Sequence, residues 1–355
     1  MKVLVTGHLG YIGPHLVDLL LEAGHRVTGI DLDLFAESEL YPHAQPQESR
    51  IGDLLDLTSE ELRGFDAVMH LAGISNDAMG MLDPELTWRI NYEGTLHVAR
   101  CAKEAGVPRF LQASSCSVYG KTDDKPIAED GQTAPITVYA ESKIRVEEAL
   151  SELADGDFSP VFLRNATAFG SSPRIRLDLV LNNLIAAAYS TGVIRVNTDG
   201  SPWRPLIHCR DIALAFLHFL DAPRELVHNG VFNVGSSEET YQVRDVAHLV
   251  KRLMPDCELS FGTGVQAIDP RDYKVDFSKL NRTLPAFRPR FTLEAGGREL
   301  LDHFQRYGMP RDCLTGDRFI RLKVLKRKLD EGRVPASFRA TAARTRPSPL
   351  VPPTC

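Results

Sequence analysis

Short apolar runs alternate with longer amphipathic segments along the first half of the chain. The runs rich in β-branched and other apolar residues predict strands at 2–6, 26–30, 67–71, 109–113 and 160–164. Segments with helical periodicity separate them, at 11–23, 84–105 and 137–154, and Gly24 and Gly106 stand where the first two helices are expected to stop. This alternation predicts an α/β fold, a doubly wound parallel sheet with helices on both faces.

The alternation becomes irregular after about residue 170, where helices are predicted at 177–190, 211–220, 243–253 and 293–304. We therefore expect residues 1–170 to form one domain, to which later segments return, and 171–310 to form mainly a smaller C-terminal α/β domain. The basic, amphipathic segment 318–333 predicts a peripheral helix within 311–355. Residues 336–355, rich in Pro, Ala, Thr and Arg, are expected to be a disordered tail.

Composition narrows the function classes. The 355 residues are 43% hydrophobic and 25% charged, which is typical of a globular protein, and the net charge of −6 predicts no general attraction to nucleic acid or anionic membranes. The chain has no apolar run of about 20 residues and begins with a short strand rather than a signal peptide, so we expect a cytoplasmic protein. The six cysteines are scattered without CxxC pairs, which indicates neither a disulfide framework nor a metal site.

A glycine turn follows the first predicted strand. The sequence runs from Val3-Leu4-Val5-Thr6 into Gly7-His8-Leu9-Gly10-Tyr11-Ile12-Gly13, and a predicted helix follows. Such a strand, turn and helix place backbone N–H groups and the positive end of a helix dipole beside a pyrophosphate, where a β-carbon would block the approach. The segment therefore predicts a dinucleotide-binding Rossmann domain.

Asp31 ends the second predicted strand. A carboxylate at this place can accept both hydroxyl groups of an adenosine ribose and would repel a 2′-phosphate, which favours NAD over NADP. Asp33 could share the role, and a turn-capping role for Asp31 is the alternative.

A serine-rich segment and a Tyr-Lys pair are the candidate catalytic groups. Ser114-Ser115-Cys116-Ser117 follows the strand predicted at 109–113, and so lies at the carboxyl edge of the sheet where open α/β folds bind ligands. Tyr139 and Lys143 are four residues apart on one face of a predicted helix. The ammonium can therefore lower the pKa of the phenol from about 10 toward neutrality and make it a general base.

Together these motifs resemble the extended short-chain dehydrogenase/reductase family, in its nucleotide-sugar epimerase and dehydratase branch. The resemblance covers about residues 1–308 and includes Asp53-Leu54, His70-Leu71-Ala72-Gly73, Asn91-Tyr92-Glu93-Gly94-Thr95 and Val118-Tyr119-Gly120. It implies that Tyr139 removes a proton from a sugar hydroxyl as hydride passes to NAD, that Lys143 tunes Tyr139 and binds the nicotinamide ribose, and that Ser115 bonds the same oxygen. The implied NAD-binding residues are Gly7, Leu9, Gly10, Tyr11, Ile12, Gly13, Asp31, Asp53, Leu54, Leu71, Ala72, Gly73, Asn91, Ser114, Tyr139 and Lys143.

The resemblance also implies a nucleotide-diphosphate sugar as substrate and a homodimer as the assembly. Arg204 and Arg271 match two family segments whose arginines bind the diphosphate, and surface pairing with nearby aspartates is the alternative. Thr167 stands where the family usually has Asn, which weakens the case for a substrate hydrogen bond there. Asn183, like Asn182, could contact the diphosphate or cap a helix, and the remaining substrate contacts are expected from Ser115, Ser117 and Tyr139. Asn91 could equally be a helix-surface residue.

The residue types at positions 116 and 117 help to distinguish which reaction the family resemblance implies. Related dehydratases have an Asp-Glu pair at this point and decarboxylases a Glu, whereas this chain has Cys116-Ser117. The absence of a carboxylate favours C4 epimerisation through a transient 4-keto sugar. A Cys116 thiol with a lowered pKa would instead allow dehydration, decarboxylation or C3/C5 epimerisation. A 4-ketoreductase is a further alternative, and a non-catalytic NAD-binding sensor or scaffold is a remote one.

Overall fold

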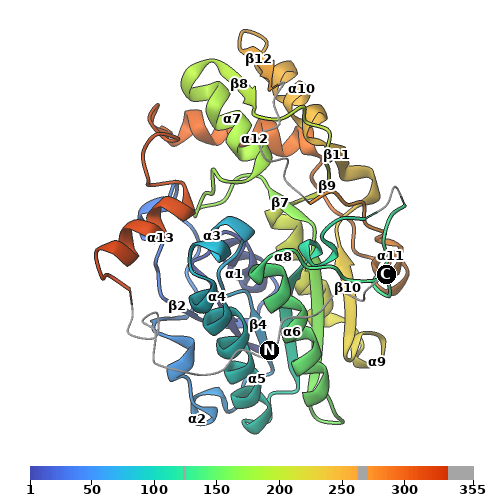
Figure 1. The fold of residues 1–355 in the computed structure, drawn as a ribbon. Coiled ribbons are helices and arrows are strands. Elements are labelled where there is room, and N and C mark those ends of the chain that lie inside the picture. Colours follow the sequence, from blue (N-terminus) through green and yellow to red (C-terminus); the bar gives the residue numbers. More distant parts are fainter. Residues whose placement is uncertain (123–124, 263–270, 335–355) are drawn as a thin grey trace.

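A seven-stranded parallel sheet forms the centre of the computed structural model, which describes residues 1–122, 125–262 and 271–334 (Figure 1). Its strand order is β10-β6-β5-β4-β1-β2-β3. The strands are β1 (Lys2–Thr6), β2 (Arg26–Asp31), β3 (Glu48–Ile51), β4 (Ala67–His70), β5 (Arg109–Ser115), β6 (Ser159–Asn165) and β10 (Gly230–Val234). The chain winds outward from β1 to β3 and then returns to the other side of β1 as β4. This reversal opens a crevice at the carboxyl ends of β1 and β4, where doubly wound sheets bind ligands.

Helices cover both faces of this sheet, so the predicted doubly wound fold is confirmed. Buried apolar residues of α1 (Gly13–Glu22) and α8 (Cys209–Asp221) pack on one face. Those of α5 (Thr95–Glu104) and α6 (Val138–Leu153) pack on the other. Shorter helices complete this part of the fold: α2 (Ser59–Leu62), α3 (Asp77–Leu82), α4 (Pro84–Trp88), α9 (Arg224–Val227) and α11 (Ser278–Thr283).

The helix predicted at 84–105 is continuous but not uniform. A π-helical turn at Arg89–Gly94 joins α4 to α5. Such turns widen a helix locally and often occur at functional sites. Here the turn contains Asn91, whose side chain is buried beside the segment that follows β4.

A second, smaller layer lies above the carboxyl edge of the sheet (Figure 1). Strands β7 (Thr167–Phe169), β9 (Trp203–His208) and β11 (Thr240–Gln242) form a three-stranded sheet, and β8 (Val193–Val196) pairs with β12 (Glu258–Phe261). Helices α7 (Val180–Thr191), α10 (Val243–Leu253) and α12 (Leu293–Arg306) surround a separate apolar cluster here. In the described segments, no helix has the length and apolar character needed to cross a membrane.

The last described helix, α13 (Arg321–Asp330), lies beside α3 and the connection between β2 and β3 (Figure 1). Arg327 Nη2 and Lys328 Nζ contact the carboxylate of Glu37 at 2.6 and 3.0 Å, and Leu325 is buried. The predicted helix at 318–333 is thus present, and it packs over the ligand-binding edge of the fold. The tail expected at 336–355 lies outside the described residues.

Candidate active site

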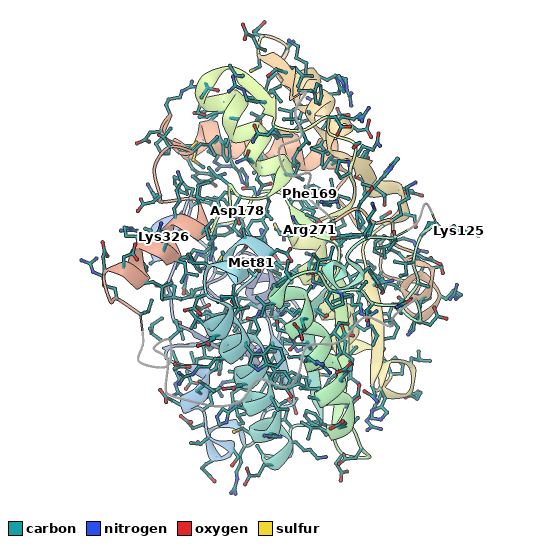
Figure 2. The ribbon with its side chains drawn as sticks, viewed as in Figure 1. Met81, Lys125, Phe169, Asp178, Arg271 and Lys326 are labelled. Atoms are coloured by element: carbon teal, nitrogen blue, oxygen red, sulfur yellow. The ribbon has the colours of Figure 1, made fainter. Side chains whose placement is uncertain are left out.

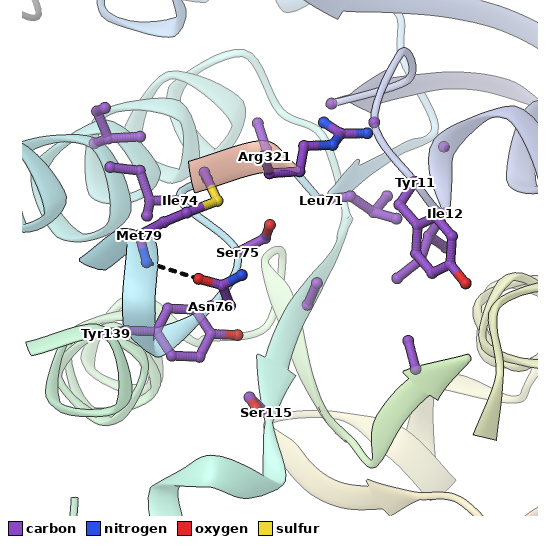
Figure 3. A pocket seen from close by; sticks show the side chains of 18 of the residues that line it. Tyr11, Ile12, Leu71, Ile74, Ser75, Asn76, Met79, Ser115, Tyr139 and Arg321 are labelled. Carbon is purple, nitrogen blue, oxygen red and sulfur yellow. Dashed lines mark hydrogen bonds between the residues drawn. The ribbon is translucent and has the colours of Figure 1, made fainter. Parts of the chain in front are cut away.

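One continuous pocket runs along the carboxyl edge of the sheet, between the glycine turn and the smaller layer (Figure 3). Segments far apart in the sequence line it: the β1–α1 turn, the ends of β2, β4 and β5, the start of α6, β7, residue 271 and helix α13. The pocket therefore lies at the crevice that the strand order predicts.

The glycine turn has the geometry expected of a dinucleotide cradle. Gly7 has φ +75°, and a β-carbon there would lie 2.6 Å from the backbone nitrogen of Ala72. At Gly13 a β-carbon would lie 2.4 Å from the carbonyl oxygens of Gly7 and His8. Both positions thus require glycine, and α1 starts directly behind the turn. The residues present fit a bound pyrophosphate.

Asp31 joins the turn to the end of β2. Its carboxylate accepts hydrogen bonds from the backbone N–H groups of Leu9, at 3.0 Å, and Asp33, at 2.9 Å. Both Asp31 and Asp53 line the pocket, as do Leu54 and Gly52, which places these four residues at the expected adenosine end, an assignment that stays a prediction. The carboxylate of Asp33 instead pairs with Arg174 at 3.0 Å, so Asp31 alone of the two faces the pocket.

Ser115 and Tyr139 meet at the opposite end of the pocket. Ser115 ends β5, and Tyr139 lies in the first turn of α6 (Figure 3). The N-cap of this helix, Thr137, accepts a hydrogen bond from Ala140 N–H. Burial, together with the charge of Asp77, raises the pKa of the Tyr139 phenol to about 12, and the hydrogen bond with Ser115 opposes this shift. The lowered pKa that the Tyr-Lys spacing predicts is therefore not seen in the protein by itself.

Lys143 lies one helical turn below Tyr139. Its Nζ donates to the carbonyl oxygen of Ala113 at 2.8 Å. Burial lowers the pKa of Lys143 to about 8, and Glu147 opposes that shift. Ser114, beside it, donates to Glu147 Oε1 at 2.5 Å and also lines the pocket. Leu71, Ala72 and Gly73 form the wall between these residues and the glycine turn.

Cys116 is not placed for acid/base chemistry, which corrects the interpretation of its thiol as a catalytic group. The side chain is fully buried in the main apolar cluster and donates to the carbonyl oxygen of Arg164 at 3.1 Å. Burial raises the pKa of the thiol far above its ordinary value. The turn after β5 directs Ser115 and Ser117 to the pocket and Cys116 away from it.

The ligand contacts expected of Asn91 and Asn183 also need correction. Both side chains form hydrogen bonds with backbone groups, and neither residue lines the pocket. Asn91 bonds the N–H and C=O of Ile74, at 2.8 and 3.0 Å, and fixes the chain after β4. It is therefore a positioning residue. Asn183 donates to the carbonyl oxygen of Leu177 at 2.8 Å, and the neighbouring Asn182 bonds Gly170 and Arg176.

Of the other residues predicted to bind the substrate, some line the pocket and one lies behind its wall. Ser117, Thr167 and Arg271 line the pocket. Arg204 does not: it is buried behind the wall, where its Nη1 donates to the carbonyl oxygens of Trp203 and Arg271 at 2.7 and 2.6 Å. The structure therefore brings the two arginines together but exposes only Arg271 to a ligand. Asp269 and Pro270 of the same motif lie outside the described residues.

Several pocket residues were missed by the sequence analysis. Asp77, at the start of α3, is paired with Arg271, which is labelled in Figure 2, and its carboxylate accepts a hydrogen bond from Thr137. Arg176 pairs with Asp178 at 2.8 Å, and Asn76 donates to the same carboxylate at 2.6 Å. The polar run Ser75-Asn76-Asp77 after β4 was a usable signal, because it follows a strand end at the carboxyl edge. Arg321 of α13 also lines the pocket, and no local pattern indicated it.

Comparison with known proteins agrees with this geometry. Residues 3–235 match the model described as the NAD dependent epimerase/dehydratase family. The chain belongs to that family. It is an enzyme of the NAD-dependent nucleotide-sugar epimerase and dehydratase type, which confirms the resemblance seen in the motifs and NAD as the cofactor.

Individual relatives span several reactions. A UDP-glucose 4-epimerase of Azospirillum brasilense is 32% identical over 71% of this chain and 77% of its own length. A UDP-glucuronic acid decarboxylase 1 of Arabidopsis thaliana is 29% identical over 86% of this chain and 70% of its own length. The solved structure of MoeE5 in complex with UDP-glucuronic acid and NAD has a TM-score of 0.74 and 26% identity, covering 86% of this chain and 99% of that one. These similarities establish the family, but its members catalyse different reactions, so similarity alone does not identify the reaction of this protein.

Proposed function

We propose that this protein is a C4 epimerase of a nucleoside diphosphate sugar, with a UDP-sugar as the first candidate substrate. The observation that carries the proposal is the make-up of the turn after β5. Ser115 and Ser117 line the pocket, the intervening Cys116 thiol is buried in the core, and this turn carries no carboxylate. C4 epimerisation needs only the removal and return of a hydroxyl proton and a hydride, whereas elimination needs a further acid/base pair.

The described residues suit that reaction. Bound NAD would supply a reversible hydride acceptor. Tyr139 would take the C4 hydroxyl proton while Ser115 orients the same oxygen, and both groups would reverse their roles when the ketone is reduced. Lys143, bonded to the carbonyl oxygen of Ala113, would place a positive charge beside them. Because burial and Asp77 keep the phenol protonated in the protein alone, deprotonation depends on positive charge brought into the pocket on binding.

Substrate binding is proposed through Arg271, whose guanidinium would form charge-assisted bonds with a diphosphate. Arg204 would act as a positioning residue, since it holds the Arg271 backbone. A homodimer remains a prediction from the resemblance.

Asp77 supports a second candidate function. This carboxylate lines the pocket and acts on the Tyr139 phenol, so it could serve as the acid/base group of an elimination or decarboxylation. Its contacts with Arg271 and Thr137 instead favour a structural role for the carboxylate in the protein alone.

The deciding experiment is proton NMR of the enzyme with UDP-glucose, UDP-galactose and UDP-glucuronate in deuterated buffer. Epimerisation at C4 returns the substrate's own hydrogen, so the expected product has the inverted C4 centre and no deuterium on carbon. Tyr139→Phe should reduce the rate by roughly a thousandfold or more. Deuterium at C5, a new methyl group at C6, or loss of the carboxyl carbon would exclude pure C4 epimerisation and point to the second candidate.

A further inference from the structure

Helix α13 connects two sides of the cofactor pocket. On one side Leu325 belongs to a small apolar cluster with Ile74 and Met79, which follow β4 and line the pocket. On the other side Arg327 and Lys328 are paired with Glu37, in the connection that follows β2. The helix therefore crosses the cleft instead of lying on the outer surface. It also lies outside residues 3–235, the part that the family model matches.

Arg321, the first residue of α13, points into this cleft. Figure 3 shows its guanidinium directed toward the side that carries Tyr11 and Ile12 of the glycine turn. The residue is 3% exposed. Its Nη2 donates to the carbonyl oxygen of Arg174 at 3.2 Å, and its guanidinium carbon lies 4.0 Å from the centroid of the Phe35 ring.

This buried cation has no carboxylate within ion-pair distance among residues 1–122, 125–262 and 271–334. The two carboxylates whose charges act on it are engaged elsewhere: Asp178 pairs with Arg176, and Asp31 accepts hydrogen bonds from backbone N–H groups. Within the same described ranges, Arg321 Nε is buried without a hydrogen-bond partner. Burial, followed by the neighbouring Arg176, lowers the pKa of Arg321 to about 9. A buried guanidinium in this state is a site for an anion.

We propose that Arg321 binds the pyrophosphate of NAD from the side opposite the glycine turn, so that α13 acts as a strap across the cofactor. The turn leaves no room for a β-carbon at Gly7 or Gly13, and it contains no lysine or arginine. Arg321 supplies the missing charge and uses the donor that has no partner in the protein. The proposed sugar-diphosphate contact, Arg271, is paired with Asp77 beside Tyr139, and the Arg321 guanidinium is instead near Asp31.

The test is calorimetric titration of cofactor-free protein with NAD, ADP-ribose, adenosine and UDP. Arg321→Met should weaken NAD and ADP-ribose binding by about 10- to 100-fold, while adenosine, which lacks phosphate, changes less than about twofold. Arg321→Lys keeps the charge but loses the fork of donors, so its losses should be intermediate. Lys326→Met is the matched control because Lys326 is an exposed lysine of the same helix, and it should leave all four affinities within about twofold (Figure 2).

Two outcomes would overturn the proposal. Equal weakening of adenosine and NAD by Arg321→Met would show that α13 only packs the pocket wall. A loss confined to UDP would assign Arg321 to the substrate. Chemical denaturation of the cofactor-free protein checks that the variants are folded. Because Arg321→Met removes a buried charge that has no ion-pair partner among the described residues, the variant should be as stable as the wild type or more stable. If Arg321→Met is less stable, the affinities of Arg321→Lys decide the test. Because these readouts are binding affinities, they are independent of whether the C4 reaction is correct.

Discussion

The Lys143 ammonium lies 5.8 Å from the centroid of the Tyr139 ring and donates a hydrogen bond to the carbonyl oxygen of Ala113 at 2.8 Å. Two residues that share a helix face are thus held by different parts of the pocket. Lys143 reaches back to β5, while Tyr139 faces Asp77 and Ser115. The arrangement concentrates a buried positive charge and a buried phenol at one end of the site, and each has a shifted pKa.

Lys143→Met is expected to stabilise the cofactor-free protein and to remove activity. Burial lowers the pKa of Lys143 from 10.5 to about 8, so the folded state binds this proton less tightly than the unfolded state does. Below pH 8 the charge is present in both states, and its burial costs about 1 to 3 kcal/mol. As pH rises from about 8 to about 10.5 the folded protein loses the proton first and the cost disappears.

Urea denaturation of wild type and variant across pH 7 to 10.5 measures this difference. The variant's advantage should shrink steadily as the pH rises through that window. An advantage that does not depend on pH, or a variant less stable at pH 7, would contradict the assignment of the buried charge.

Asp77→Asn should lower the pKa of Tyr139, because the negative charge of Asp77 favours the neutral phenol. The acidic limb of the kcat/KM profile should then move to lower pH. KM for the sugar nucleotide should also change, since the ion pair between Arg271 and Asp77 is lost. Steady-state kinetics over pH 5 to 9 give both quantities; a limb that stays in place would mean that Asp77 does not act on the phenol during turnover.

Cys116→Ala should leave the pH profile and the rate within about twofold, because the thiol lies in the core rather than on the pocket wall. The substitution should instead lower the free energy of unfolding by about 1 kcal/mol, because packing and the hydrogen bond to the Arg164 carbonyl are lost. Thermal unfolding and kinetics on the same preparation separate the two effects. A large loss of rate in a stably folded variant would contradict this prediction and show that the thiol takes part in catalysis.

Glu147→Gln is predicted to destabilise the protein by about 3 kcal/mol or more. Glu147 Oε2 accepts from Arg164 Nη2 at 2.6 Å, and both side chains are less than a tenth exposed, at 6% and 7%. Removing one partner leaves the other charge buried without compensation. Denaturant unfolding measures the loss. Glu148→Gln is the control because Glu148, which pairs with Arg145, is 52% exposed, and ion pairs of exposed carboxylates contribute little.

The sequence alone determined the elements that depend on local pattern. Apolar, β-branched runs located the five predicted strands of the main sheet, and helical periodicity located α6, which carries Tyr139 and Lys143. The glycine turn, Asp31, Ser115 and Tyr139 could be assigned for the same reason, since strand ends and helix starts fix where their side chains go. Strand β3 was missed because its four residues, Glu48–Ile51, are all exposed and show no apolar alternation.

Only the tertiary structure decided which of the remaining polar residues reach the pocket. Cys116 sits between two pocket residues in sequence but points away, because the turn after β5 sets its direction, and Asn183 bonds the Leu177 carbonyl at the start of α7 instead of a ligand. Arg321 shows the reverse case: nothing in its basic helix indicates a ligand, yet Glu37 and the apolar cluster around Leu325 fix that helix across the cleft. A local pattern specifies an element and the faces it presents, whereas the partner of each face depends on long-range packing of the whole chain.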